Sequence, residues 1–251
     1  YTFNLRDVGR VCQGILQITP AKCPEADTFV KLWSHETSRV FCDRLINNAD
    51  RTWFRGEVAK VSSSMFSKDL DPEELGKTVF GGYMNTTAGA SGATYELLEI
   101  PKSQEKMDEY LNDYNLQSTK PMNLVFFSDA CLHLARLSRV LTQPRGCALL
   151  VGVGGSGRSS LVRLAANMWD MKCMGIEITR TYDNTSWRDD LKSFMFEAGC
   201  GNKPTVFLYS DTQIIKESMV EDVNGILNSG EVPNLMEVED MERILTAVRP
   251  M

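Results

Sequence analysis

Helical spacing of apolar residues dominates the first part of the chain. Over residues 4–18 apolar side chains recur every three or four positions, which predicts a helix with one buried face. These side chains are Leu5, Val8, Cys12, Ile15 and Leu16. A second helix is predicted over residues 25–48. Its inward side chains are Phe29, Trp33, Val40, Phe41 and Leu45, and Arg39 and Asp43 are spaced to pair on its outer side.

The stretch from residue 80 to residue 120 is less regular. Residues 80–100 are rich in Gly, Ala, Ser and Thr, which predicts a mobile loop leading into one short extended piece. Residues 103–118 are polar and predict a surface helix, and Pro121 marks a boundary. No strand alternates convincingly before that boundary, so residues 1–120 are predicted to be mainly helical.

The pattern changes after Pro121. A helical stripe runs from Phe127 to Leu141, and three short apolar runs then alternate with helical segments. The runs are residues 147–153, 173–179 and 205–211, and each predicts a buried strand. Ser186 and Asp189 are spaced as a capping box for the helix between the last two runs. Strands separated by helices predict an α/β fold with a parallel sheet.

The segment "VGVGGSGRSS" (151–160) has the pattern of a phosphate-binding loop. Gly152 and Gly157 frame four residues, and the hydroxyl of Ser159 follows. The loop comes after a predicted strand and before a predicted helix, where backbone N–H groups and the helix dipole favour phosphate. Arg158 stands where lysine is usual. Its guanidinium is longer, planar and forked, so we expect binding to survive more easily than catalysis.

A second phosphate-side element is expected at the end of another strand, as apolar residues followed by Asp-Glu. The candidate is the run 206–209 followed by Ser210 and Asp211. In one register Ser210 takes the position of the aspartate that supports Mg²⁺, called the metal-side position here, and Asp211 takes the position of the glutamate. A shift of one residue makes Asp211 the metal-side acid and leaves Thr212 in the glutamate's place. Either register lacks or shortens one carboxylate, which predicts little or no hydrolysis.

Composition narrows the function classes. The chain has 251 residues and a net charge of −6, and it has no Lys/Arg run, so we expect no nucleic-acid binding. No apolar stretch approaches the length of a membrane span, so we expect no membrane partner either. Seven scattered cysteines without a CxxC pair fit reduced thiols better than disulfides or metal ligands. "HETSR" (35–39) lacks the second histidine of a zinc motif, so a structural role is expected for His35. The chain begins at Tyr1 without a signal peptide, and we expect it to be part of something longer.

Several stretches together resemble the dynein heavy chain family, specifically its axonemal members. They are "YTFNLRDVGRVCQGIL", "LWSHETSRVFCDRL", "LVGVGGSGRSSLVRLAA", "DDLKSFMFEAG" and "LNSGEVPNL". The first two resemble the end of the third AAA+ module of the motor ring, and the last three the start of the fourth. The resemblance implies a helical lid subdomain over 1–120 and the N-terminal part of an αβ P-loop subdomain over 121–251.

The resemblance also implies roles for individual residues. Arg6 matches the sensor arginine of the third module, and the stretch 124–128, with Val125, is placed to contact adenine. Ser159 and Ser210 fall on the Mg²⁺ side, and Asp211 falls at the catalytic glutamate. The phosphates of ATP or ADP would be held by Gly152, Val153, Gly154, Gly155, Ser156, Gly157, Arg158, Ser159 and Ser160.

For the parent protein the resemblance implies ATP-driven, microtubule-based movement in cilia and flagella, with this module regulating. Its partners would be the neighbouring AAA+ modules, and through other parts of the heavy chain the intermediate and light chains and microtubules. The expected location is cytoplasm and cytoskeleton, in the axoneme. Two alternatives stay open: an unrelated P-loop NTPase or kinase, and a structural AAA+ module that binds no nucleotide. "NKPT" (202–205) lacks the aspartate of a guanine-reading motif, which argues against a GTPase.

Overall fold

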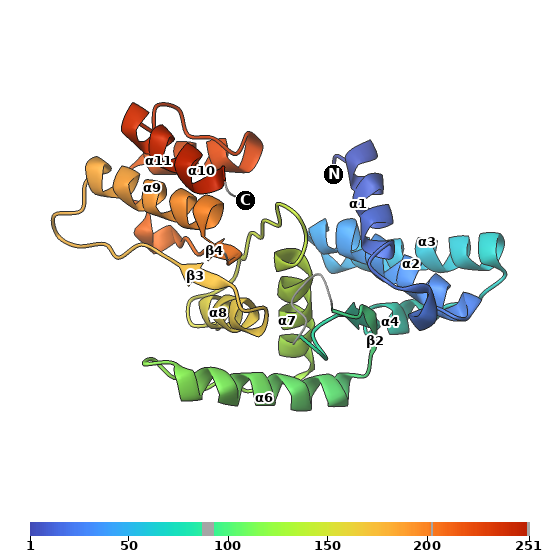
Figure 1. Ribbon diagram of the computed structural model, residues 1–251. Helices are drawn as coiled ribbons and strands as arrows, with labels where there is room; N and C mark the ends of the chain where they lie inside the picture. The colour runs from blue at the N-terminus through green and yellow to red at the C-terminus, as the bar shows by residue number, and fades with distance from the viewer. Residues whose placement is uncertain (87–92, 202, 250–251) are drawn as a thin grey trace. The chain divides into compact units, whose positions relative to one another are not determined.

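The computed structural model describes residues 1–86, 93–201 and 203–249 and mixes helices with short strands (Figure 1). It divides into two compact units, residues 1–142 and residues 143–251. Each unit is described by itself below. None of the helices in the described residues is long and apolar enough to cross a membrane.

The first unit is mainly helical. Two 3₁₀ turns, η1 (Pro20–Lys22) and η2 (Cys42–Arg44), accompany its α-helices. The helices are α1 (Leu5–Ile15), α2 (Ala26–Val40), α3 (Asn48–Phe66), α4 (Pro72–Leu75), α6 (Ile100–Gln117) and α7 (Ser128–Leu141). Asn4 begins α1 with a capping box, because its side chain accepts from the N–H of Asp7 and the Asp7 carboxylate accepts from the N–H of Asn4. The helix predicted over 25–48 ends early, at Val40, and η2 follows it.

Helix α1 buries a different face from the one its apolar residues predict. Leu5, Val8 and Leu16 are exposed, whereas Asp7, Val11 and Gly14 are buried. The reason is close packing on α2, where Gly14 makes room for the Glu36 carboxylate. A Cβ at Gly14 would lie 1.8 Å from Glu36 Oε2, so only glycine fits there. A polar side chain on the partner helix therefore selects the face that α1 buries.

A connected group of polar side chains is buried in the first unit. Glu36 is fully buried and accepts a hydrogen bond from the Tyr95 hydroxyl at 2.6 Å. It also accepts from Nε of Arg139 at 3.0 Å and from Nη2 of the same guanidinium, which joins α2 to α7. Arg39 pairs with Asp43 as predicted, at 3.4 Å, but its side chain is buried and the expectation of an outer position is wrong.

His35 is also buried in this group. Its Nδ1 lies 3.0 Å from the carbonyl oxygen of Thr78, and because a carbonyl can only accept, this nitrogen carries the proton. Burial and the neighbouring Arg39 hold the pKa of His35 well below its ordinary value. The contact with Thr78 confirms the structural role that the sequence predicts for His35.

A two-stranded antiparallel hairpin completes the first unit. Strand β1 (Val79–Gly81) pairs with β2 (Glu96–Leu98), and Phe80 stands opposite Leu97. Helix α7 packs against β1 and α6 (Figure 1). The sequence shows no alternation at β1 because all three of its residues are buried. Of the loop predicted over 80–100, residues 87–92 lie outside the described residues.

The second unit contains two parallel strands. Strand β3 (Lys172–Met174) pairs with β4 (Thr205–Phe207), with Cys173 opposite Val206. Around them lie α8 (Arg158–Met168), α9 (Asn184–Cys200), η3 (Asp211–Gln213), α10 (Glu217–Asn228) and α11 (Val238–Val248). Helix α9 lies between the two strands in sequence, as expected of a parallel crossover. Its cap is Asp183 rather than the predicted Ser186, because the Asp183 carboxylate accepts from the N–H and the hydroxyl of Ser186.

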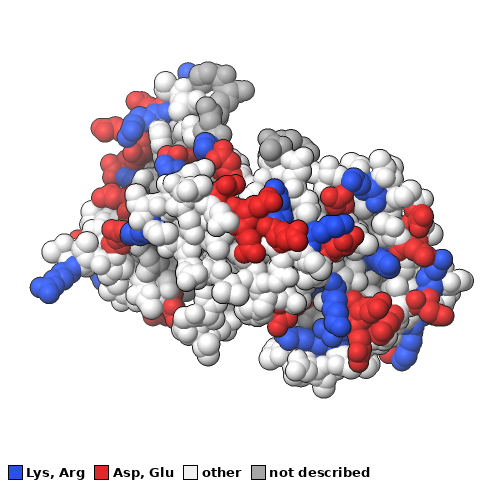
Figure 2. Space-filling model, turned by 90° about the horizontal axis from the view of Figure 1, so that it is seen from below, with Lys and Arg blue, Asp and Glu red and all other residues white. Residues whose placement is uncertain are grey.

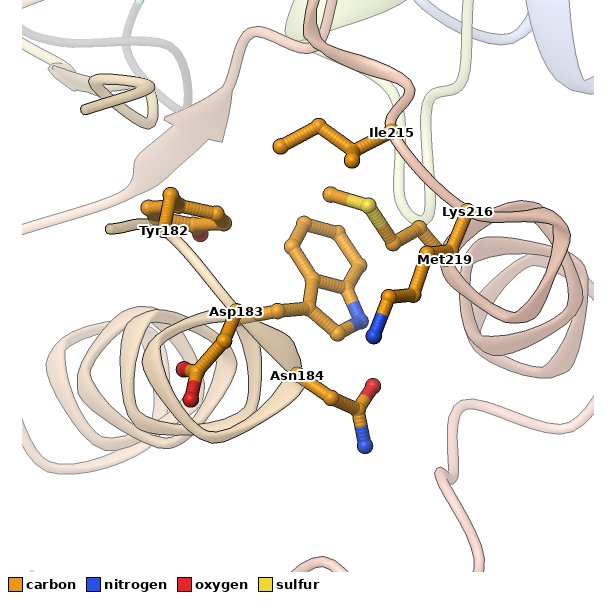
Figure 3. A pocket seen from close by; sticks show the side chains of 7 residues that line it. Tyr182, Asp183, Asn184, Ile215, Lys216 and Met219 are labelled. Carbon is orange, nitrogen blue, oxygen red and sulfur yellow. The ribbon is translucent and has the colours of Figure 1, made fainter. Parts of the chain in front are cut away.

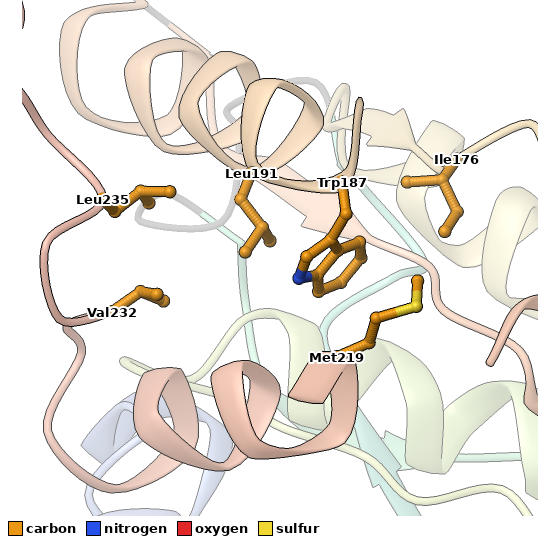
Figure 4. Close-up of a cluster of buried hydrophobic side chains, with 6 residues drawn as sticks. All are labelled: Ile176, Trp187, Leu191, Met219, Val232 and Leu235. Carbon is orange, nitrogen blue, oxygen red and sulfur yellow. The ribbon is translucent and has the colours of Figure 1, made fainter. Parts of the chain in front are cut away.

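The core of the second unit is apolar (Figure 4). Trp187 and Leu191 of α9 are fully buried and point toward Met219 of α10. The other members of this cluster are Ile176, Val232 and Leu235. The Trp187 Nε1–H donates to Asp222 at 2.8 Å, so the polar atom of the largest core side chain has a partner. This core fixes the positions of α9 and α10 beside the strands.

The surface carries both signs of charge. On the face shown in Figure 2, Lys and Arg side chains are interspersed with Asp and Glu side chains. Exposed ion pairs such as Lys60 with Glu57 and Lys106 with Glu109 fit this mixed pattern. Each contributes little to stability because water screens it.

Candidate functional site

The glycine-rich loop of residues 151–157 leads directly into helix α8. Gly155 and Gly157 have φ angles of 78° and 77°, in the left-handed region that glycine adopts without strain. Gly157 is the residue before the first turn of α8, so the loop curls immediately ahead of the helix. A Cβ built at Gly155 meets nothing within 4 Å, so backbone conformation alone requires glycine there.

Backbone N–H groups at this turn are available to a ligand. In the described part of the chain, none of the N–H groups from Gly152 to Ser160 makes a backbone hydrogen bond, and the first in the helix is from Leu161 to Gly157. The first N–H groups of any helix lack partners within it, and they carry partial positive charge. Most of the loop is exposed. Its residues therefore fit a phosphate group, which can accept from several N–H groups at once.

The apolar run before the loop does not form the predicted strand. Residues 147–153 have no regular structure, and Leu149 and Val151 are 89% and 85% exposed. A strand needs a neighbour for its N–H and C=O groups, and the two strands of this unit pair only with each other in the described residues. The expectation of a buried strand over 147–153 is therefore wrong for this structure.

Arg158 turns back onto the loop. Its Nη2 donates to the Val153 carbonyl at 3.1 Å, and its Nη1 lies 3.5 Å from the Leu150 carbonyl. Ser159 is the next residue in the first turn of α8, and it is exposed. The structure thus brings the predicted cation and the predicted hydroxyl to the same helix end, with the guanidinium held by the loop itself.

Ser210 and Asp211 lie just beyond β4 and contact each other. The Ser210 hydroxyl donates to Asp211 Oδ1 at 3.0 Å, and the Thr212 N–H donates to the same oxygen at 3.0 Å. Within the described residues, neither side chain hydrogen-bonds to the glycine loop. The Asp211 carboxylate is exposed and is held in its own turn.

Gln213 is a structural residue of this turn that the sequence analysis missed. Its Oε1 accepts from the Ser210 N–H at 2.7 Å, and its Nε2 donates to the Ile176 carbonyl at 2.6 Å. The side chain thereby ties the end of β4 to the segment that follows β3. The signal was present in the sequence, because serine followed three residues later by glutamine is the spacing of a capping box.

Val125 and Arg6 lie in the first unit. Val125 is 77% exposed, and the Phe126 carbonyl beside it accepts a hydrogen bond from Gln104 of α6. Asn115 of α6 holds the same segment by bonding both the N–H and the carbonyl of Met122, at 2.7 and 2.8 Å. Arg6 is exposed in the first turn of α1, so its guanidinium is open to solvent.

A small pocket in the second unit lies apart from the glycine loop (Figure 3). Its lining comes from the start of α9 and the start of α10: Tyr182, Asp183, Asn184, Trp187, Ile215, Lys216 and Met219. The Tyr182 hydroxyl donates to Asp190 at 2.6 Å, and burial followed by that carboxylate raises the pKa of Tyr182. The Ser186 N–H lowers the pKa of Asp183. Tyr182 and Asp183 therefore make local hydrogen bonds that begin and stabilise helix α9.

Metal ligands are sparse around the loop. Among the described residues, no group of three or more His, Cys, Asp or Glu side chains is placed to hold a metal ion. The oxygen donors that the sequence predicts for the Mg²⁺ side are the Ser159 hydroxyl, in the first turn of α8, and the Ser210 hydroxyl and Asp211 carboxylate, beyond β4. This set fits a Mg²⁺ ion that arrives with a nucleotide and keeps phosphate and water ligands, and not a dedicated protein cage.

Comparison with known proteins places both parts of the chain in one family. Residues 122–251 match the family model described as "P-loop containing dynein motor region D4", and residues 1–51 match "Dynein heavy chain, ATPase lid domain". Similar proteins include dynein axonemal heavy chain 1 of Rattus norvegicus, 43% identical over 254 residues, and human dynein axonemal heavy chain 6, 44% identical over 253. The dynein-1-beta heavy chain of the flagellar inner arm I1 complex of Chlamydomonas reinhardtii is 40% identical over 260 residues. Each alignment covers 100% of this chain and 6% of the relative.

Proposed function

Because this chain belongs to the dynein heavy chain family and matches axonemal members along its whole length, we propose that its glycine loop binds the phosphates of an adenine nucleotide. The proposed module regulates an ATP-driven motor of the ciliary or flagellar axoneme. The lid subdomain of the preceding module and the start of the next P-loop subdomain are the proposed identities of residues 1–120 and 121–251.

One observation carries this proposal. Gly155 and Gly157 hold left-handed conformations directly before α8, and the N–H groups from Gly152 to Ser160 are free of backbone partners in the described chain. An anion accepts from such groups and gains from the dipole of the helix. We assign the loop residues to the α- and β-phosphates, and from the family resemblance we assign Arg6 to the nucleotide of the preceding module.

We propose that hydrolysis at this site is slow or absent. The side chain at the metal-side position is Ser210, whose hydroxyl donates to Asp211, and Asp211 is one carbon shorter than the usual glutamate. A carboxylate bound in its own turn is poorly placed to orient an attacking water. Positioning and charge neutralisation supply most of the rate in phosphoryl transfer, so losing both favours holding over cleavage.

The role proposed for the parent protein follows from nucleotide binding without rapid hydrolysis. A site that holds nucleotide without rapid turnover can bias the neighbouring AAA+ modules of the same heavy chain toward one arrangement. Microtubules and the intermediate and light chains are proposed partners of other parts of the protein. The proposed location is the axoneme, within the cytoskeleton.

Binding is tested with a fluorescent ADP analogue on the full chain and on the variant Gly155→Asp. Aspartate at a φ of 78° is strained, and its charge repels phosphate, so affinity should fall by at least about tenfold. The matched control is Gly230→Asp, where φ is 81° and a Cβ also meets nothing within 4 Å. The control should bind as the unaltered chain does. Equal affinity in all three proteins, or no binding by the unaltered chain, would contradict the proposal and favour a module that binds no nucleotide.

Hydrolysis is tested in the full-length motor with its other nucleotide sites disabled. A single-turnover assay should show bound ATP persisting far longer than one motor cycle. Asp211→Asn should leave that slow rate almost unchanged, because the carboxylate is not expected to serve as a base. Rapid loss of ATP from this loop, abolished by Asp211→Asn, would refute the proposal of a slow site while leaving nucleotide binding intact.

A further inference from the structure

The side chain of Arg158 spans the two arms of the glycine loop. It starts at the first residue of α8 and reaches the carbonyls of Val153 and Leu150 on the opposite arm, at 3.1 and 3.5 Å. On the way it passes Gly152, where an added Cβ would lie 3.7 Å from Arg158 Cδ and 3.8 Å from Nε. The guanidinium is therefore held against the arm that precedes the turn.

The forked shape of the guanidinium suits this arrangement. A guanidinium presents five N–H donors in a plane, so it reaches two carbonyls with different nitrogens, whereas an ammonium is a compact point charge. Hydrogen bonds from a charged donor to a carbonyl are stronger than neutral ones, so the charge stays with these acceptors unless a better one displaces them. The guanidinium of Arg158 thus rests against residues 150–153 through two of its five N–H donors.

We infer that Arg158 makes this loop a site for nucleoside diphosphate in preference to triphosphate. The inference rests on the proposed function, since it names the ligand class of the same loop. Backbone N–H groups and the helix end supply about half a unit of positive charge, which suits the inner phosphates. A third phosphate adds charge that a mobile lysine normally neutralises, whereas Arg158 can move toward that phosphate only by giving up its contacts with Val153 and Leu150.

The inference is tested by the ratio of two affinities measured on the full chain. ADP and a non-hydrolysable ATP analogue compete against one fluorescent nucleotide, each with Mg²⁺ present. The unaltered chain should bind ADP more tightly by about tenfold, the scale of one charged hydrogen bond lost. Arg158→Lys should bring the ratio to within about threefold, because an ammonium is free to follow the third phosphate.

Two further variants keep the test specific. Arg163→Lys makes the same chemical change at an exposed position of the same helix and should leave the ratio unchanged. Arg158→Gln removes the charge while leaving an amide donor, so it should retain the preference for ADP even where overall affinity drops. Thermal midpoints of all variants confirm that each is folded.

The outcomes separate this inference from the function on which it rests. Equal affinity of the unaltered chain for both ligands, or a ratio that Arg158→Lys does not move, overturns the inference and leaves nucleotide binding in place. Binding of neither ligand, with no effect of Gly155→Asp, overturns the proposed function and the inference together. A preference for ADP lost in Arg158→Lys and kept in Arg163→Lys and Arg158→Gln supports the inference.

Discussion

The two units of this chain differ in whether their polar and charged side chains are buried. In the described residues, every buried polar or charged residue lies in the first unit, among them Asp7, His35, Glu36 and Arg139. The second unit has an apolar core and exposes the loop that carries Arg158. The first unit is therefore specified by particular polar contacts, and the second by apolar packing, with its polar groups left for a ligand.

The largest effect should come from breaking the buried pair of the first unit. Glu36→Met leaves the Arg139 guanidinium and the Tyr95 hydroxyl buried without their acceptor, which should lower the free energy of unfolding by about 4 kcal/mol. Urea unfolding, followed by hydrogen exchange of the amides of α2 and α7, measures this loss. The control Glu57→Met removes an exposed pair with Lys60 and should cost less than about 0.5 kcal/mol.

A multiple variant sharpens the first result. Glu36→Met, Tyr95→Phe and Arg139→Met together replace the polar group with apolar side chains, and should recover most of the stability lost by Glu36→Met alone. That recovery would show that the penalty comes from the unpaired partners. A small effect of Glu36→Met would mean that the first unit does not depend on this pair, and the contrast between the units would fail.

The free energy of unfolding of the second unit should fall more when a core side chain loses volume than when a side chain loses its charge. Trp187→Ala removes a fully buried side chain from its core and should cost about 3 kcal/mol, confined to α9, α10 and the strands. Trp53→Ala, at a position 66% exposed, serves as the control and should cost less than about 0.5 kcal/mol. Asp222→Asn keeps an acceptor for the Trp187 N–H and should cost less than about 1 kcal/mol. A larger cost for Asp222→Asn than for Trp187→Ala would reverse the comparison.

The same contrast explains what the sequence could predict about the fold. Periodicity located α1, α2, α7 and α9, because a helix that buries one face repeats its apolar residues. It chose the wrong face of α1, since the contact of Gly14 with Glu36 is a pairing between distant segments that no local pattern records. It also predicted a strand over 147–153. These residues are apolar, but in the described chain no neighbouring strand pairs with them.

The candidate site was predicted in part. The glycine spacing located the loop, and the structure adds the left-handed conformations of Gly155 and Gly157. The sequence also located Ser210 and Asp211 at the end of the third run, but it could not show that they bond to each other. The contacts of Arg158 with Leu150 and Val153 were equally out of reach, because a side-chain rotamer depends on the shape of the finished loop.

The smallest predicted effect is a dependence on pH that only the first unit should show. Burial keeps the pKa of His35 well below 6.5, so the folded state leaves the imidazole neutral while the unfolded state takes up a proton near pH 6.5. The free energy of unfolding is therefore undiminished above pH 6.5 and falls as the pH drops, by about 1 kcal/mol between pH 6.5 and 5.5. Arg39 and Arg139 stay charged in this window, and carboxyl groups in the unfolded chain titrate below it. His35→Gln should remove most of the slope because glutamine can still donate to Thr78 but cannot titrate, whereas His133→Gln, at a half-buried position, should retain most of it. An unchanged slope in His35→Gln, measured by hydrogen exchange of α2, would show that the imidazole takes up a proton as readily inside the fold as in the unfolded chain. The Glu36 carboxylate, 3.8 Å from His35 Nε2, would then offset the effect of burial.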